Sequence, residues 1–273
     1  MMEDEDGVMG PLRLLGVASL MALFWAGGTL SGEPPTEPQV WVDTSRWQVE
    51  LPADSALRVS NRLGDIRARS SGDGKLLVVA IIQRFAPEQT DADVSISTKE
   101  GEVVVETHYP SAEIRNEDGR LNGRIDLSLL VPAGLEMQVE TDHGLIEVKG
   151  VKRDLTARTS SGRLRLTTGR RVSAQTGSGE LRVVLKNPSV ARPARLETKD
   201  GPLRVDLLDR PDLSLRARTA GEILLWPGRM GEKSVSRENG LSELRLGNEP
   251  FALEALSATA SIEVRAVPAN ELR

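Results

Sequence analysis

Histidine and cysteine, two residue types that commonly carry catalysis or bind metals, are scarce or absent in this chain. Its two histidines, His108 and His143, lie 35 residues apart, and it has no cysteine. A zinc site needs a cluster of Cys, His or acidic ligands, so we expect no metal and no cofactor. A nucleophilic serine would need one of these histidines beside it on a strained turn, but the chain has no Gly-x-Ser-x-Gly. Its Ser-Ser-Gly segments, which end at Gly72 and Gly162, are interpreted as turns.

Carboxylates are plentiful, and β-helical proteins include polysaccharide lyases and hydrolases that use paired acids in a groove. Asp200 and Asp206 flank one predicted strand, although strand alternation and turn placement explain both residues without catalysis. The segment from Gly72 to Lys75 lacks the Ser or Thr that follows the lysine of a phosphate-binding loop. We predict a non-catalytic protein, with a polysaccharide-acting β-helix enzyme as the alternative.

The most regularly spaced charged side chains are arginines. Arg165, Arg182 and Arg204 each follow a recurring glycine by three positions, and alternation along a strand would point all three outward. Like charges on neighbouring strands repel unless carboxylates or a ligand neutralise them. Two interpretations stay open: a stripe that binds an anionic envelope polymer, or a solvated strand face that is balanced by Glu180 and Asp206. Residues 149–245 carry 21 basic and 11 acidic groups in a chain of net charge −5.

These arginines belong to a repeat of 17 to 22 residues. The segment around Gly64 matches that around Gly144 at an offset of 80 residues, and the glycine then recurs at 162, 179, 201 and 221. An aliphatic residue stands two and four positions after each glycine, and threonine stands three positions before four of them (Thr141, Thr159, Thr176 and Thr198). Each unit is predicted to be a strand, a turn in which glycine supplies a positive φ, and a second strand.

Equivalent positions in successive repeats are alike, which favours an all-β solenoid over an antiparallel meander. Parallel coils place matching residues about 4.8 Å apart, so aliphatic residues stack and threonine hydroxyls can bond along a ladder. The solenoid is predicted over residues 46–267, with a less regular section at 46–135 and regular coils at 136–267. Ala258 to Val267 is expected to be an atypical terminal coil, followed by a tail at 268–273.

Three tryptophans have predicted places in this architecture. Trp41 and Trp47 are expected to plug the N-terminal end of the core, and Trp226 is expected to fit a coil corner. Stacking on carbohydrate is the alternative role for them.

The N-terminal region predicts export. Arg13 precedes an uncharged run, Leu14 to Gly32, which is interpreted as a helical signal peptide or membrane anchor within residues 1–32, behind an acidic leader. Residues 33–45 are rich in proline and are expected to form an extended spacer. We therefore expect a periplasmic or cell-surface protein that is held at the membrane by residues 14–32 if the segment is not cleaved. Nucleic acid is not an expected partner, because the coils lack aromatic stacking residues.

The lead-in Pro-Ala-x-x-x-hydrophobic-x-Val, the following Gly-x-Ile-x-Val and the serial Thr-Ser-Ser-Gly-x-Leu units resemble the bacterial putative adhesin family of exported β-helical domains and its head-GIN relatives. The resemblance covers roughly Leu51 to Val267. It implies a right-handed single-chain β-helix and an adhesive or scaffolding role in the cell envelope. We expect the partner to be an anionic envelope polymer or a surface protein. A self-polymerising β-helical scaffold is a further alternative, so self-association is included among the expectations.

Overall fold

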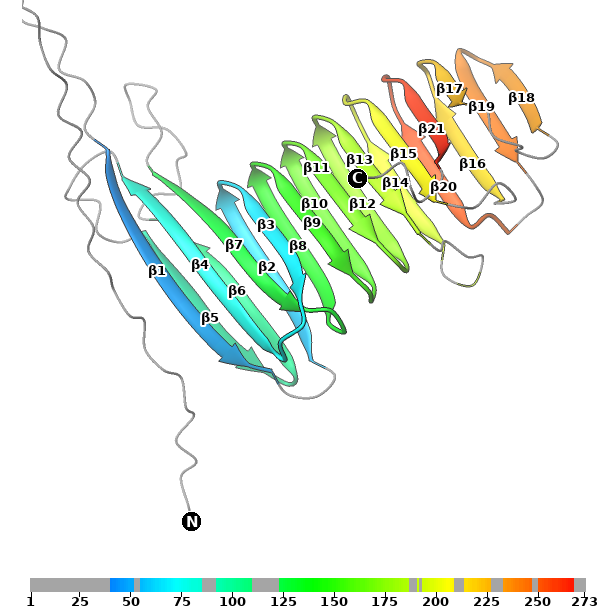
Figure 1. The fold of residues 1–273 in the computed structure, drawn as a ribbon. Helices are drawn as coiled ribbons and strands as arrows, with labels where there is room; N and C mark the ends of the chain where they lie inside the picture. The colour runs from blue at the N-terminus through cyan, green and yellow to red at the C-terminus, as the bar shows by residue number, and fades with distance from the viewer. Residues whose placement is uncertain are drawn as a thin grey trace, which may run out of the picture.

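The computed structural model describes residues 40–51, 55–84, 92–109, 123–186, 191, 193–208, 214–226, 233–246 and 250–267, which form two facing β-sheets (Figure 1). In spatial order, sheet A consists of β1 (Trp41–Glu50), β4 (Lys75–Arg84), β7 (Arg124–Pro132), β3 (Ile66–Ser71), β9 (Ile146–Val151), β11 (Leu164–Thr168), β13 (Leu181–Leu185), β15 (Leu203–Leu208), β21 (Ile262–Val267) and β17 (Ile223–Trp226). Sheet B consists of β18 (Lys233–Glu238), β19 (Leu241–Leu246), β16 (Leu215–Thr219), β20 (Leu253–Ser257), β14 (Ala194–Thr198), β12 (Val172–Ser178), β10 (Leu155–Ser161), β8 (Glu136–His143), β2 (Ala56–Leu63), β6 (Glu102–His108) and β5 (Asp93–Lys99).

Each regular repeat is one coil, with a strand in sheet B, a corner at the glycine and a strand in sheet A. Strands β8, β10, β12 and β14 are parallel neighbours, and so are β9, β11, β13 and β15. Matching residues lie in register, as Ala157 does with Ala174 and Leu164 with Leu181. The parallel stack predicted from the like residues is confirmed, and the antiparallel meander is wrong for these coils.

The aliphatic columns fill the space between the two sheets. Val139 and Ala157 from sheet B and Ile146 and Leu164 from sheet A are all fully buried. A continuous cluster of buried side chains extends from Trp47 in β1 to Val264 in β21. Side chains alternate between the two faces of a strand. Every second residue therefore lies on an outer face, while the residues between them build this core.

The corner glycines are required chiefly because neighbouring coils approach closely there. A Cβ atom on Gly201 would lie 1.7 Å from the carbonyl oxygen of Gly179, and one on Gly144 would lie 2.0 Å from that of Gly64. Gly144 also has a φ of +154°, whereas Gly201 is not among the residues with positive φ. The predicted positive φ therefore holds at only some of the corners, and the close approach of backbones explains the rest.

The buried threonines beside these corners do not form the predicted ladder of hydroxyl groups. Thr176 Oγ1 donates to the carbonyl oxygen of Gly162 in the preceding coil at 3.1 Å, and Thr198 Oγ1 accepts from the N–H of Gly201 in its own corner at 3.0 Å. The Thr159 hydroxyl has no hydrogen-bond partner among the residues that the structure describes. Threonine thus serves the backbone polar groups of the corner rather than other threonines.

The first coil of the chain does not stand at the end of the stack. Strand β2 pairs in parallel with β6 and β8, and β3 pairs in parallel with β7 and β9, so this coil lies between two coils that follow it in sequence (Figure 1). The two segments that match at an offset of 80 residues are therefore direct neighbours. The described strands between Leu76 and Leu130 lie in the same two sheets and add the antiparallel pairs β1–β4, β4–β7 and β5–β6 at the N-terminal end of the stack.

The last coil is likewise out of sequence order, which corrects the prediction of a terminal coil at Ala258 to Val267. Strand β20 pairs in parallel with β14 and β16, and β21 pairs in parallel with β15 and β17. Figure 1 shows β20 and β21, in red, between the coil β14–β15 and the coil β16–β17. Ala260 replaces the corner glycine inside the stack, and its carbonyl oxygen accepts from Thr219 Oγ1 at 2.6 Å.

The N-terminal end of the core is closed by the first strand and by a buried polar network. Trp47 in β1 has 9% of its surface exposed and belongs to the core, as predicted, while Trp41 is half-buried. Asn61 replaces the column threonine in β2; its Nδ2 donates to the carbonyl oxygen of Ile125 at 2.8 Å, and its Oδ1 accepts from Tyr109 at 2.9 Å. Burial raises the pKa of the Tyr109 phenol to about 12.

The predicted signal or anchor, residues 1–32, and the tail at 268–273 lie outside the described residues, as does the side chain of Trp226. Strand β1 begins at Trp41, inside the segment expected to be a spacer. In the described ranges, no helix is long and apolar enough to cross a membrane.

Candidate functional site: an arginine row on sheet A

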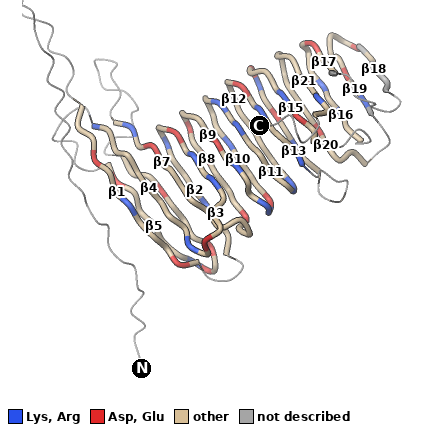
Figure 2. The backbone as a smooth tube through the Cα atoms, viewed as in Figure 1, with Lys and Arg blue, Asp and Glu red and all other residues tan. Residues whose placement is uncertain are grey.

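Arg165 on β11, Arg182 on β13 and Arg204 on β15 lie on the outer face of sheet A; we call these three residues the arginine row. The strand register places Arg165 opposite Arg182, and Arg182 opposite Arg204. Neighbouring strands are about 4.8 Å apart, so one extended anion can contact successive guanidinium groups. Figure 2 shows that Lys and Arg positions recur on successive coils along the stack. The structure thus brings together all three residues predicted from the sequence.

Asp206 neutralises one end of the arginine row. Its side chain is fully buried, although its position in β15 belongs to the outer face. Arg182 Nη2 lies 3.0 Å from Oδ2 of Asp206, and two further arginines contact Oδ1: Arg265 Nε at 2.8 Å and Arg204 Nε at 3.7 Å. Burying a carboxylate is costly unless cations and hydrogen bonds compensate, and here three guanidinium groups do so. Arg182 and Arg204 are therefore partly committed to a partner inside the protein.

Arg165, at the other end of the row, is exposed and has no ion-pair partner among the residues that the structure describes. Glu147 lies opposite it on β9, but Lys149 Nζ is 2.6 Å from Glu147 Oε1. This hydrogen bond from Lys149 holds the pKa of the Glu147 carboxyl below its usual range. Glu180, which was expected to balance the row, instead pairs with Arg163 at 3.3 Å. Positive charge is therefore least compensated at Arg165.

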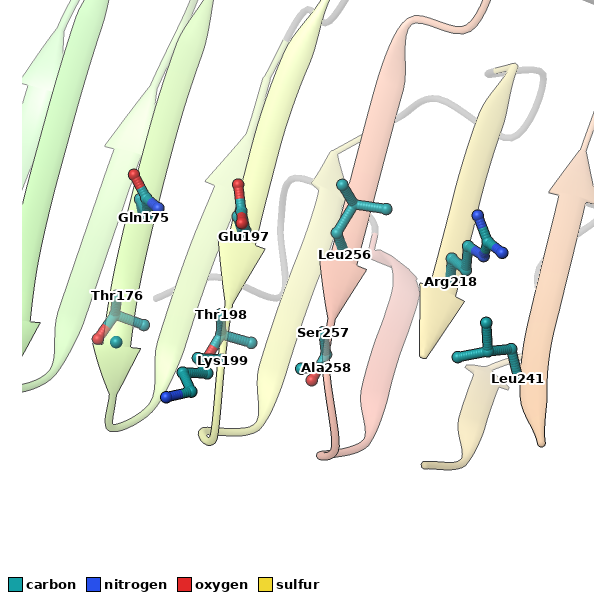
Figure 3. Close-up of a pocket in the computed structure, with 11 residues that line it drawn as sticks. Gln175, Thr176, Glu197, Thr198, Lys199, Arg218, Leu241, Leu256, Ser257 and Ala258 are labelled. Atoms are coloured by element: carbon teal, nitrogen blue, oxygen red, sulfur yellow. The ribbon is translucent and has the colours of Figure 1, made fainter. Parts of the chain in front are cut away.

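The outer face of sheet B has a depression of about 430 Å³ (Figure 3). Gln175, Glu197 and Leu256 stand in one row on β12, β14 and β20, and Arg218 follows on β16. Of the described residues that line it, Glu197 is the one carboxylate. Glycoside hydrolysis generally uses two carboxylates that flank the scissile bond, so this depression does not support the enzyme alternative.

The remaining residues considered from the sequence do not come together into one site. His108 on β6 and His143 on β8 are separated by β2, and within the described ranges no three potential ligands cluster as a metal site. His108 Nε2 lies 2.8 Å from Ser95 Oγ on the exposed hairpin β5–β6, a contact that the sequence analysis missed. Asp93, opposite His108, uses its Oδ1 to accept from the N–H of Val94. Asp200 is exposed at a corner, whereas Asp206 is buried.

Sequence reasoning also missed two charged residues of the arginine face, Glu263 and Arg265. Glu263 lies opposite Arg204, with Oε2 3.6 Å from Arg204 Nη1, and Arg265 lies opposite Asp206. Both belong to β21, which was expected at the end of the stack. The sequence did contain a signal for this strand. Ile262 and Val264 stand at alternate positions, as do the aliphatic residues that follow the corner glycine in the other coils.

Similarity to solved structures is broad in coverage and low in identity. A cell adhesion protein from Clostridium sporogenes, described as putative, is 12% identical with a TM-score of 0.41, and the match covers 83% of this chain and all of that one. An adhesin from Bacteroides fragilis, described in the same way, is 8% identical with a TM-score of 0.30, over 86% of this chain and all of that one. An adhesin from Parabacteroides merdae, also described as putative, is 7% identical with a TM-score of 0.32, and the match covers 83% of this chain and 90% of that one.

These matches agree with the family resemblance noted in the sequence. No family model and no curated protein matches the chain.

Proposed function

We propose that this chain is a non-catalytic adhesion or scaffold module of the cell envelope, and that the arginine row binds an anionic envelope polymer. The observation that carries the proposal is the register of three outward arginines on adjacent strands, with Arg165 free of internal ion pairs in the described structure. Strand hydrogen bonds fix the spacing of these side chains, so little backbone has to be ordered when a polymer binds. The extracytoplasmic location rests on the predicted export segment at residues 14–32, and the right-handed winding rests on the family resemblance.

The most direct test reverses the charge at Arg165. Binding of the purified protein to polyphosphate, to polygalacturonate and to uncharged dextran is measured at low and at moderate salt. We expect Arg165→Glu to weaken binding to the two polyanions about tenfold, which corresponds to about 1.4 kcal/mol. The effect should shrink as salt rises, because exposed charges are screened.

Arg158→Glu is the matched control, because Arg158 is an exposed arginine on β10 that belongs to the outer face of sheet B. It changes net charge by the same amount without touching the arginine row. Equal losses for the two variants would show that only net charge matters, and unchanged binding in Arg165→Glu would end the proposal.

A further inference from the structure

The position of β20 and β21 in the stack has a consequence for association. These two strands, the last that the structure describes in the chain, fill a slot between the coil β14–β15 and the coil β16–β17. We propose that a second copy of this chain can fill the same slot with its own β20–β21 segment, giving a strand-exchanged dimer or a longer assembly. This inference is independent of the arginine row.

The slot cannot remain empty in a stable molecule. Leu253, Ala255, Ile262 and Val264 are fully buried between the coils on either side. Without them the columns of both flanking coils would be open to water, and two pairs of parallel strand edges would lose their hydrogen bonds. Such edges are ready templates for another strand of the right pattern.

A second copy offers a segment with the required pattern. Leu253 lies opposite Ala194 and Leu215, and Ala255 lies opposite Leu196 and Ala217, so each pair continues a column of the core. In sheet A, Ile262 lies between Leu203 and Ile223. Because the same residues make these contacts whether they come from the same chain or another, exchange adds no unfavourable contact at the slot.

The neighbouring coil makes release of the segment feasible. Strand β16 has the pattern Leu215, Ala217, Thr219, and β20 has the pattern Leu253, Ala255, Ser257 at matching positions. The coil β16–β17 can therefore cover the exposed columns of β14–β15 transiently after β20–β21 leaves, and it is displaced when a β20–β21 segment from either chain enters the slot. The released segment would then be available to a second molecule.

The absence of cysteine from the chain allows a disulfide test in the full-length protein. Glu197 on β14 and Leu256 on β20 are directly opposite and belong to the outer face of sheet B, in the row shown in Figure 3. Neighbouring strands are about 4.8 Å apart, within the Cα separation of roughly 4.4–6.8 Å that disulfides accept. Glu197→Cys and Leu256→Cys are made in separate chains, unfolded together and refolded over a range of protein concentrations under oxidising conditions.

We expect reducible dimers that join the two different chains, in a proportion that rises with protein concentration. The control is the pair Gln175→Cys and Glu197→Cys, also directly opposite, on strands β12 and β14 that would not be exchanged. It should give no dimer above the level of either variant alone. Dimers in equal amount from both pairs, or from neither, would overturn the proposal. The double variant Glu197→Cys/Leu256→Cys in one chain must also form an internal disulfide at low concentration, and its failure would contradict the slot itself.

Discussion

Gly201 separates the two reasons for a glycine at a coil corner, because its φ is not positive yet a Cβ there would lie 1.7 Å from Gly179 O. We expect Gly201→Ala to destabilise the protein by about 2–3 kcal/mol, since neighbouring backbones must move apart. Gly169→Ala is the control, because nothing lies within 4 Å of its added Cβ. Urea unfolding of both variants measures the difference, and equal stabilities would show that the corner can expand freely.

Asp206 is expected to affect stability and binding in opposite directions. Asp206→Asn removes the charge that three arginines surround, and loss of one partner from a buried ion pair costs about 3 kcal/mol. The same change frees Arg182 and leaves Arg204 with its ion pair to Glu263, so polyanion binding should become stronger. Thermal unfolding and the polyphosphate assay check the two effects, with the exposed Asp200→Asn as control. Weaker binding in a folded Asp206→Asn protein would argue against the arginine row as the binding surface.

Tyr109 predicts a loss of stability at alkaline pH. Burial raises its folded-state pKa from 10 to about 12, so the folded state holds the phenolic proton more tightly than the unfolded state does. The stabilisation is therefore fully present below pH 10 and is lost as pH rises from about 10 to about 12, by roughly 2–3 kcal/mol. Tyr109 is the one tyrosine of the chain, so phenolate absorbance reports it directly.

Tyr109→Phe provides the comparison for this titration. The variant should be less stable at neutral pH, because Asn61 loses a hydrogen-bond donor, but it should lose less stability between pH 10 and pH 12. Parallel pH profiles for the two proteins would contradict the assignment.

At the scale of elements, β1 closes the N-terminal end of sheet A through Trp47. We expect Trp47→Ala to cost about 3 kcal/mol, since the indole is part of the core. Trp41→Ala, at a half-buried position on the same strand, should cost clearly less. Denaturant unfolding compares them, and similar losses would mean that β1 contributes mainly through its hydrogen bonds to β4.

The coils were predictable from sequence because each coil requires the same residue types at the same positions. Close packing at the corner requires glycine, burial requires aliphatic residues at alternate positions, and both leave a visible period. The order of the coils was not predictable. The coils β16–β17 and β20–β21 carry similar residues at matching positions, so the local pattern does not indicate which of them packs on β14–β15. The burial of Asp206 was not predictable either. Its position in the strand indicates that it points outward, but its burial depends on Arg265, which lies beside it because β21 pairs with β15.

At the scale of the whole molecule, the inserted coil should change where the stack unfolds first. Linear repeat proteins open most easily at their ends, and β20–β21 is near the end of the sequence but inside the stack. We expect the backbone amides of β20 and β21 to exchange hydrogen as slowly as those of β14 and β15, and much more slowly than those of β18. Hydrogen exchange followed by mass spectrometry checks this, and fast exchange across residues 253–267 would contradict the insertion.

The insertion of β20–β21 also bears on the order in which the chain can fold during synthesis. A polypeptide leaves the ribosome with its N-terminus first, so the coils up to β15 can assemble while the chain is still emerging. The coil β16–β17 then appears before the segment that must lie beneath it. The finished architecture therefore becomes accessible only after residue 267 has emerged, so the stack cannot be completed coil by coil in the order of synthesis.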